Sequence, residues 1–390
     1  MKVHFIANTV FPYGAATTTR TLSYAKGFID NGVECEVIIP IPTCSASDKM
    51  NIEHKGIYKG VPFRYSYPST RRSASFIKRR YHDFVGQVKT LYHILRIPKG
   101  DIVLLYNGNN SWNRLALLAC KLSGIKSVLE MNELPNCEGE QTKEKQKQRQ
   151  ITLEKISPKF NGIIVISDEL QNLVKEYSDA KIIKVPIITP PETTPKTDSK
   201  NKERYIFHSG KLTEAKDGVC GMLEAFGIAF PKIGKDVRFI LTGNVEMSPD
   251  KDKIKAIISK YSLEKNVVFT GYIEEEELRK YQSNCTMVII NKYDSLQNKY
   301  CFATKLSEYL AMKRPVVTTN IGEAMNYLQD NVNAYIVKPH NPQLIADKII
   351  EIFNNPDKAT EIGENGFLLT TKEFNYKYQG KRMLEFFKTL

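Results

Sequence analysis

The first half of the chain alternates short apolar runs with segments of helical period. Apolar runs of this length, bounded by turn-forming or polar residues, are typical of buried strands. We expect strands at residues 3–7, 34–40, 102–106, 127–131, 162–166 and 182–186. Helical patterns lie between some of them, at residues 17–31, 113–123 and 168–177. Such alternation predicts parallel strands joined by right-handed helical crossovers.

The alternation is interrupted once and then resumes. Residues 191–203 are dominated by proline, threonine and charged residues, which is typical of a linker. After them, strands are expected at residues 204–209, 238–242, 267–270, 287–291, 315–319 and 334–337. Helices are expected at residues 218–230, 251–261, 275–284, 304–312, 322–330 and 342–354.

This pattern predicts an α/β protein with two Rossmann-like, doubly wound domains, residues 1–190 and 204–373. Ligands of open parallel sheets bind at the carboxyl ends of the strands. A ligand held by both domains is therefore expected in a central cleft that the two sheets face.

Composition agrees with a globular protein. The chain has 390 residues, of which 42% are hydrophobic, and this length is enough for two cores. Residues 1–7 are predicted to form the first buried strand rather than a secretion signal, because Pro12 and Gly14 follow closely. We therefore expect a cytoplasmic protein. Seven scattered cysteines without a C-x-x-C pair argue against a disulfide framework or a cysteine-based zinc site.

The net charge of +13 is unevenly distributed. Residues 70–99 contain eight basic residues, Arg79 and Arg80 among them, and one acid, Asp83. Aromatic residues recur in this block at near-helical spacing, which favours a basic amphipathic helix on an acidic membrane face. The alternative is a solvated charged face whose apolar side packs on the core. Nucleic acid is not expected as a partner, because no nucleic-acid-binding motif accompanies the charge.

Two loops between a strand and a helix are candidate phosphate sites. Gly14 lies in a small-residue turn after the first strand, where a ligand can approach the backbone closely. Gly210, Lys211 and Lys216 follow the first strand of the second half. Both lysines are predicted to face one diphosphate and to neutralise its charge as it leaves. The alternatives are ordinary turn chemistry for the glycine and two surface lysines.

A third candidate is the loop and helix between residues 298 and 312. Free N–H groups at a helix start attract phosphate, and Glu308 lies one turn beyond Thr304. Phosphate at the helix start and a carboxylate deeper in suggest a nucleotide whose ribose hydroxyls bind Glu308. Gly243 and Tyr272 end two neighbouring strands, where the main chain can bind a base.

In the first half, polar residues follow two strands. They are candidates for binding an acceptor hydroxyl or for acting as a base, or else for capping helices. The residues are Tyr106, Asn107, Glu130, Asn132 and Glu133.

Together these motifs resemble the retaining glycosyltransferases of the GT-B fold, in the "group 1" family (glycosyltransferase family four). The resemblance covers nearly the whole chain and is strongest over residues 205–337. Gly210-Lys211-Leu212 with Lys216 resembles the family's Gly-Arg-Leu…Lys-Gly element, which grips the donor diphosphate. Leu306 to Val317, with Glu308 and Pro315, resembles its glutamate–lysine–proline–valine signature. Residues 374–390 are, by the same resemblance, a helix that crosses back to the first domain.

The resemblance implies a metal-independent transfer of a sugar from a nucleotide sugar to an acceptor hydroxyl, with retention. Tyr300 stands where the family has the first glutamate of its pair, so Asn298, Lys299 or Tyr300 is expected to contact the sugar instead. Asn298, Phe302, Ala303, Thr304 and Lys305 complete the expected donor site. Similar variants occur in enzymes of bacterial surface-polysaccharide assembly, which makes a glycan or lipid-linked acceptor at the inner membrane face the expected partner. No cofactor is expected.

Two other functions stay open at this point. One is a nucleotide-sugar 2-epimerase of the same fold, which needs carboxylates around the sugar. The other is a non-catalytic nucleotide-sugar-binding protein, which the substitution at Tyr300 suggests.

Overall fold

The computed structural model describes residues 1–106, 108–191 and 203–390, which form two compact units. The first unit comprises Met1–Pro191, Tyr300–Phe302 and Glu373–Leu390, and the second comprises Glu192–Lys299 and Ala303–Lys372. Of the expected linker, residues 192–202 lie outside the described residues, as does Asn107.

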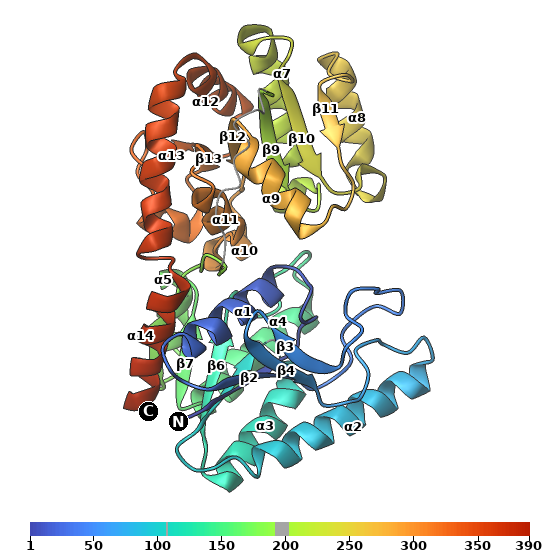
Figure 1. Ribbon diagram of the computed structural model, residues 1–390, viewed down its shortest axis with the longest axis vertical. Coiled ribbons are helices and arrows are strands. Elements are labelled where there is room, and N and C mark those ends of the chain that lie inside the picture. Colours follow the sequence, from blue (N-terminus) through green and yellow to red (C-terminus); the bar gives the residue numbers. More distant parts are fainter. Residues whose placement is uncertain (107, 192–202) are drawn as a thin grey trace. The chain divides into compact units, whose positions relative to one another are not determined.

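The first unit is built on an eight-stranded sheet in the order β3-β4-β2-β1-β5-β6-β7-β8 (Figure 1). Neighbouring strands are parallel except for β3 and β4, which pair antiparallel. The strands are β1 (Val3–Ala7), β2 (Cys35–Ile39), β3 (Lys55–Tyr58), β4 (Val61–Tyr65), β5 (Ile102–Tyr106), β6 (Lys126–Met131), β7 (Gly162–Val165) and β8 (Lys181–Lys184).

Helices cover both faces of this sheet. Helix α1 lies in the crossover from β1 to β2, which runs toward one edge of the sheet, whereas α2 and α3 lie in the crossovers to β5 and β6, which run toward the other edge. Because these crossovers are right-handed, α1 covers one face of the sheet and α2 and α3 cover the other. Helix α1 packs against the C-terminal helix α14, and α2 packs against α3 (Figure 1). The bounds are α1 (Ala16–Ile29), α2 (Phe76–Ile94), α3 (Asn110–Ser123), α4 (Lys143–Ile151), α5 (Asp168–Lys175) and α14 (Tyr376–Thr389).

The second unit is built on a parallel six-stranded sheet in the order β11-β10-β9-β12-β13-β14. Its strands are β9 (Tyr205–Ser209), β10 (Arg238–Thr242), β11 (Val267–Phe269), β12 (Met287–Ile290), β13 (Val316–Thr319) and β14 (Tyr335–Val337). Its helices are α6 (Glu214–Asp217), α7 (Val219–Ile233), α8 (Lys251–Lys260), α9 (Glu275–Asn284), α10 (Leu296–Tyr300, whose last residue belongs to the first unit), α11 (Lys305–Ala311), α12 (Pro342–Asn354) and α13 (Pro356–Thr371).

Each sheet has one point at which the strand order reverses direction. In the first unit it lies between β1 and β5, and in the second between β9 and β12. Consecutive crossovers diverge there, which leaves a crevice at the carboxyl ends of the two strands. The apolar residues of β9, β10 and α7 pack into one buried core beneath this point in the second unit.

Every expected strand is present, with ends that differ by at most two residues. The prediction of a helix over residues 322–330 is wrong, because only a short 3₁₀ turn forms at Gly322–Asn326. The sequence did not predict the hairpin of β3 and β4, helix α4 or helix α13. Helix α4 is polar on all sides and has no buried residue, so it carries no hydrophobic period. No described helix combines the length and the apolar character that crossing a membrane requires.

Candidate functional site

The switch point of the second unit gathers charged and polar side chains. His208 and Ser209 end β9, and Asn291 and Lys292 follow β12, which pairs with β9 in parallel. Helix α6 follows the β9 loop and ends in the buried Asp217. Polar residues at the carboxyl ends of adjacent parallel strands meet at one edge of the sheet, which is where such sheets bind ligands.

Asp217 is the centre of this cluster. One carboxylate oxygen accepts a hydrogen bond from Lys305 Nζ at 2.7 Å and lies 3.6 Å from Lys292 Nζ. The other accepts the backbone N–H of Lys211 at 3.1 Å. Lys305 also donates to the backbone carbonyl of Ser209 at 2.8 Å, and Lys292 donates to that of Lys216. The carboxylate therefore holds two ammonium groups and the start of the loop together.

The charges of the cluster stabilise each other. Burial alone would raise the pKa of Asp217, but the ammonium groups of Lys305 and Lys292 bring it well below its usual range. Burial, together with Lys305, lowers the pKa of His208 to about 3, so its imidazole is neutral at pH 7. His208 Nδ1 donates to the Ile289 carbonyl at 3.0 Å. Its Nε2 and the Oδ1 of Asn291 are then buried acceptors without a partner among the described residues.

Two glycines are required by this packing. A Cβ atom on Gly210 would lie 2.5 Å from the Asp217 carboxylate and 2.9 Å from His208 Nε2. Gly218 has a positive φ of 61°, and a Cβ there would lie 2.4 Å from Asn291 Nδ2, which donates to the Gly218 carbonyl at 2.8 Å. Side chains at these positions would displace the groups that line the crevice.

The two predicted phosphate lysines contribute to the cluster through their backbones. The side chains of Lys211 and Lys216 are both exposed, whereas Lys292 and Lys305 form ion pairs with Asp217. Gly243 is joined to Gly271 by a backbone hydrogen bond of 2.8 Å, so the ends of β10 and β11 lie together. The side chain of Tyr272, next in the chain, is 87% exposed.

Helix α11 brings Lys305 and Glu308 to the same unit. It has seven residues, and the side chain of Thr304 forms no cap. The hydroxyl of Tyr309 accepts the N–H of Ser209 at 2.8 Å, which anchors the helix to the end of β9. Burial raises the pKa of the half-buried Glu308, and the Lys305 ammonium opposes this shift. Because α11 is short, we assign the cationic character of this site to lysine side chains more than to the helix dipole.

The predicted donor loop is divided between the two units. Asn298 is buried in the second unit, and its Nδ2 donates to the carbonyl of Tyr293 at 2.8 Å. Tyr300 and Phe302 belong to the first unit. There the Tyr300 carbonyl accepts from Ser167 Oγ at 3.0 Å, and the Phe302 ring packs edge-on against Phe374 at 5.8 Å. The buried ring of Phe302 thus has a structural contact. Ala303, the next residue, is half-buried and opens the return to the second unit.

In the first unit, the predicted acceptor residues differ in their exposure. Tyr106 and Glu130, expected at an acceptor surface, are instead buried. Glu130 Oε1 accepts from Arg20 Nε at 2.7 Å, and Arg20 also donates to the carbonyls of Pro186 and Val185. Burial raises the pKa of Glu130, although the Arg20 guanidinium opposes the shift. This pair joins α1, β6 and the segment after β8.

The neighbouring loop residues are more accessible. Asn132 and Glu133, at the end of β6, are half-buried. Gly14 is exposed, and a Cβ atom there would lie 2.2 Å from Thr18 Oγ1, so the turn before α1 requires glycine. Arg79 and Arg80 lie on α2, both near the ring of Phe76, at 5.6 and 5.3 Å from its centre.

Some members of the cluster were not predicted from the sequence, namely His208, Asp217, Asn291 and Lys292. His208 and Lys292 carry the signal used elsewhere, a polar residue at the end of a strand. Asp217 has no comparable local signal, because its role depends on Lys292 and Lys305, which lie 75 and 88 residues farther along the chain.

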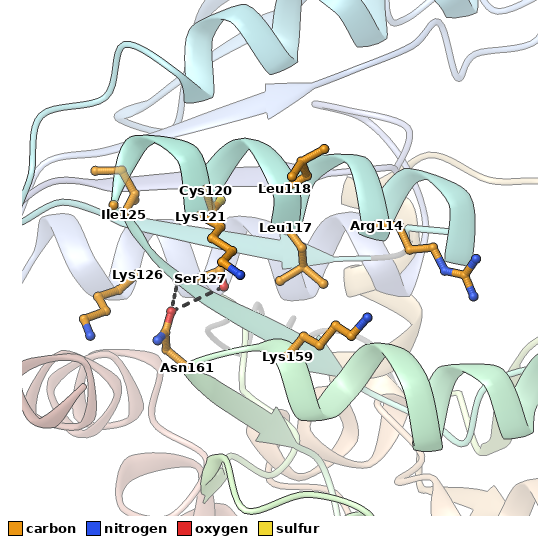
Figure 2. A pocket seen from close by; sticks show the side chains of 11 residues that line it. Arg114, Leu117, Leu118, Cys120, Lys121, Ile125, Lys126, Ser127, Lys159 and Asn161 are labelled. Atoms are coloured by element: carbon orange, nitrogen blue, oxygen red, sulfur yellow. Dashed lines mark hydrogen bonds between the residues drawn. The ribbon is translucent and has the colours of Figure 1, made fainter.

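A cavity of about 750 Å³ lies in the first unit, away from its switch point. It opens between α3 and the amino ends of β6 and β7 (Figure 2). Leu117, Cys120 and Ile125 give it an apolar lining, and four cations surround it. These are Arg114, Lys121, Lys126 and Lys159.

Solved structures share the fold of this chain. The chain superimposes over its whole length on HepE of Anabaena in complex with UDP, with a TM-score of 0.71, 14% identity and 100% of each chain covered. A TarM variant of S. aureus in complex with fondaparinux, α-GlcNAc-glycerol and UDP gives a TM-score of 0.69 at 13% identity, covering 99% of this chain and 100% of that one. The fold is GT-B, as predicted.

Sequence comparison gives a matching family model. Residues 191–368 match the model of glycosyl transferases group 1, the family that the sequence resembles. A curated relative is the poly(ribitol-phosphate) alpha-N-acetylglucosaminyltransferase of Staphylococcus aureus (strain COL), 23% identical over 350 residues. The match covers 86% of this chain and 65% of the relative, so the chain spans less than two thirds of that protein's length.

Proposed function

We propose that the protein is a retaining glycosyltransferase that moves a sugar from a nucleotide sugar to an acceptor hydroxyl in surface-glycan assembly. The observation that carries the proposal is the lysine cluster around Asp217, at the switch point of β9 and β12 and inside the segment of the group 1 family. HepE and the TarM variant were both crystallised with UDP, and the curated relative transfers a sugar. These likenesses support a nucleotide-sugar donor for this chain.

The cluster supplies the electrostatics that such a reaction needs. A departing nucleoside diphosphate gains negative charge, and fixed ammonium groups stabilise that charge in the transition state. Asp217 holds Lys305 and Lys292 at the crevice, and the exposed Lys211 and Lys216 lie on the adjoining loop and helix. Each ammonium has three donors, so Lys305 keeps one for a ligand after its bonds to Asp217 and Ser209. The neutral His208 and Asn291 offer acceptors for ligand hydroxyls.

This arrangement leads us to propose phosphate neutralisation by lysine without a catalytic metal. In the chelator-treated enzyme, added Mg²⁺ or Mn²⁺ should leave the transfer rate unchanged. A rate that depends on either ion would overturn this part of the proposal.

The donor is tested by thermal shift of the full chain against a panel of nucleotide sugars and nucleoside diphosphates. The double variant Lys211→Gln, Lys216→Gln should keep its melting temperature without ligand, because both side chains are exposed. Its affinity for the diphosphate should fall at least about tenfold, since each hydrogen bond to a charged group contributes about 1.5–3 kcal/mol. Lys235→Gln, another exposed lysine of the second unit, is the control. Equal affinity in both variants would contradict the role of the two lysines.

Turnover separates the proposal from its alternatives. We expect release of the diphosphate only when an acceptor is present, with a product whose anomeric configuration equals that of the donor. Isomerisation of the sugar without acceptor would identify an epimerase instead. Tight donor binding without turnover across glycan and lipid-linked acceptors would identify a non-catalytic binding protein.

Helix α2 supports a peripheral membrane contact for the same enzyme. Its inner face is anchored: Gly86, Thr90 and Ile94 are buried, and a Cβ atom on Gly86 would lie 2.1 Å from the Pro40 carbonyl. The outer face exposes Ile77, Tyr81 and Phe84 at 79%, 61% and 65%. The core-packed alternative for these aromatic residues therefore does not hold.

Cations flank this apolar face of α2. They include Lys78, Arg79, Arg80, Lys89 and Arg96. Helix α3, beside it, adds the exposed Leu115, Leu118 and Leu122, and the cations around the cavity in Figure 2. An exposed apolar stripe with flanking cations fits the surface of an anionic bilayer. We propose that this face docks the enzyme where a lipid-linked acceptor would lie.

Liposome flotation tests the membrane contact. The full chain should float with vesicles that contain acidic phospholipid and much less with neutral ones. The double variant Ile77→Ser, Phe84→Ser should bind at least about tenfold less, because burying each side chain contributes about 1.5–3 kcal/mol. Tyr378→Ser, which removes an exposed aromatic ring from α14, is the control. Flotation of the double variant at the wild-type level would refute the contact.

A further inference from the structure

Two histidines and a carboxylate meet at the amino ends of β1 and β2, in the first unit. His4 lies on β1, Glu36 on β2, and His93 in the last turn of α2. One ligand atom of each lies within 4.8 Å of the other two. The three residues come from different elements, and this edge of the sheet is opposite to the carboxyl ends that form the crevice.

The hydrogen bonds of His4 determine which of its nitrogens faces His93. His4 Nε2 lies 3.3 Å from a carboxylate oxygen of Asp101, and His4 Nδ1 lies 3.1 Å from His93 Nε2. A carboxylate only accepts, so His4 Nε2 carries a proton and His4 Nδ1 accepts the Nε2–H of His93. A cation bound by these two nitrogens would take the place of that proton, which the His93 imidazole would then carry on Nδ1. A histidine whose far nitrogen donates to a carboxylate is the usual arrangement of a metal ligand.

One further charged group faces this site. Arg64 Nε donates to one oxygen of Glu36 at 2.9 Å, so this arginine competes with a cation for the carboxylate.

We propose that His4, His93 and Glu36 form a binding site for a divalent transition-metal ion, with zinc as the best fit, and that Asp101 orients His4. Zinc–nitrogen bonds are about 2.0–2.1 Å long, so nitrogens 3.1 Å apart subtend an angle of about 100° at the metal, near the tetrahedral value. With three protein ligands, water takes the fourth position. A bound ion would fasten the end of α2 to β1 and β2. The inference is independent of the proposed transfer reaction.

The test uses the full chain, freed of metal by a chelator and titrated with Zn²⁺ by calorimetry and with Co²⁺ by absorption. We expect one equivalent of either ion per chain, and a Co²⁺ spectrum without a thiolate charge-transfer band. His93→Gln and Glu36→Gln should lose at least tenfold in affinity. His82→Gln, on the same helix but stacked on Tyr67, is the matched control and should bind as the wild type does.

Two further variants keep the test decisive if His93→Gln is unstable. Arg64→Gln should bind Zn²⁺ more tightly, because Glu36 loses its competing partner. Asp101→Asn should bind about 10- to 100-fold more weakly, as expected when the carboxylate behind a ligating histidine is removed. Bound Zn²⁺ should raise the melting temperature of the wild type and of His82→Gln. A wild type that binds no stoichiometric ion, a thiolate band, or equal affinity of His93→Gln and His82→Gln would overturn the proposal.

Discussion

Replacing Asp217 by asparagine tests the organisation of the lysine cluster. The change keeps the shape of the side chain but removes the charge that Lys305 and Lys292 share. Breaking a fully buried ion pair by removing one partner costs about 3–5 kcal/mol. The side chains of Lys305 and Lys292 are 19% and 15% exposed, so water partly solvates their ammonium groups when the carboxylate is removed. We therefore expect a loss at or below the lower limit of this range, about 2–3 kcal/mol.

The loss should be visible in thermal unfolding. For a unit of this size, 1 kcal/mol corresponds to about 2–4 °C, so Asp217→Asn should lower the melting temperature of the second unit by about 4–12 °C at pH 7. Asp252→Asn, which changes an exposed carboxylate on α8, should leave it within the error of the measurement. Urea unfolding, followed by circular dichroism, gives the free energy directly.

The pH dependence provides a second check on the same variant. The pKa of Asp217 is lower in the folded state than in the unfolded state, so its contribution is present above the unfolded pKa of about 4. It is lost as the pH falls through the lower, folded pKa. The difference between wild type and Asp217→Asn should thus be constant from pH 5 to 8 and shrink below pH 4. Equal stability of the two proteins at pH 7, or a difference that persists unchanged at pH 3, would refute the reasoning.

Two further substitutions probe the packing around each switch point. Arg20→Met leaves Glu130 buried without its cationic partner, and we expect the free energy of unfolding to fall by about 3–5 kcal/mol. This loss should grow between pH 5 and 8, because a buried carboxyl with a raised pKa destabilises the fold as the pH rises. A pH-independent loss in urea unfolding would contradict this. Gly210→Ala should displace the Asp217 carboxylate, cost about 1–3 kcal/mol and weaken protection by nucleoside diphosphate, whereas Gly56→Ala should be nearly neutral. Undiminished protection of Gly210→Ala in a thermal shift assay would count against the proposed site.

The sequence by itself determined the order and type of the main elements. Strands such as β1, β5 and β10 form where expected, because their apolar runs must be buried whatever surrounds them. The alternation of strands and helices then leaves few topologies, since crossovers between parallel strands are right-handed. For the same reason, the sequence predicted the carboxyl ends of the strands, with the Gly210 loop, as the place of a candidate site.

Only the tertiary structure decided which charges meet. Arg20 and Glu130 are 110 residues apart, and nothing local in either segment indicates that they form a buried pair. In the same way, Asp217 is partnered by Lys292, which follows β12, and by Lys305, the first residue of α11. The period of α2 predicted an apolar face, but whether that face meets the core or the solvent depends on Gly86, which brings the opposite face against Pro40. Periodicity is a property of neighbouring residues, whereas partners and exposure are set by elements that the chain brings together from a distance.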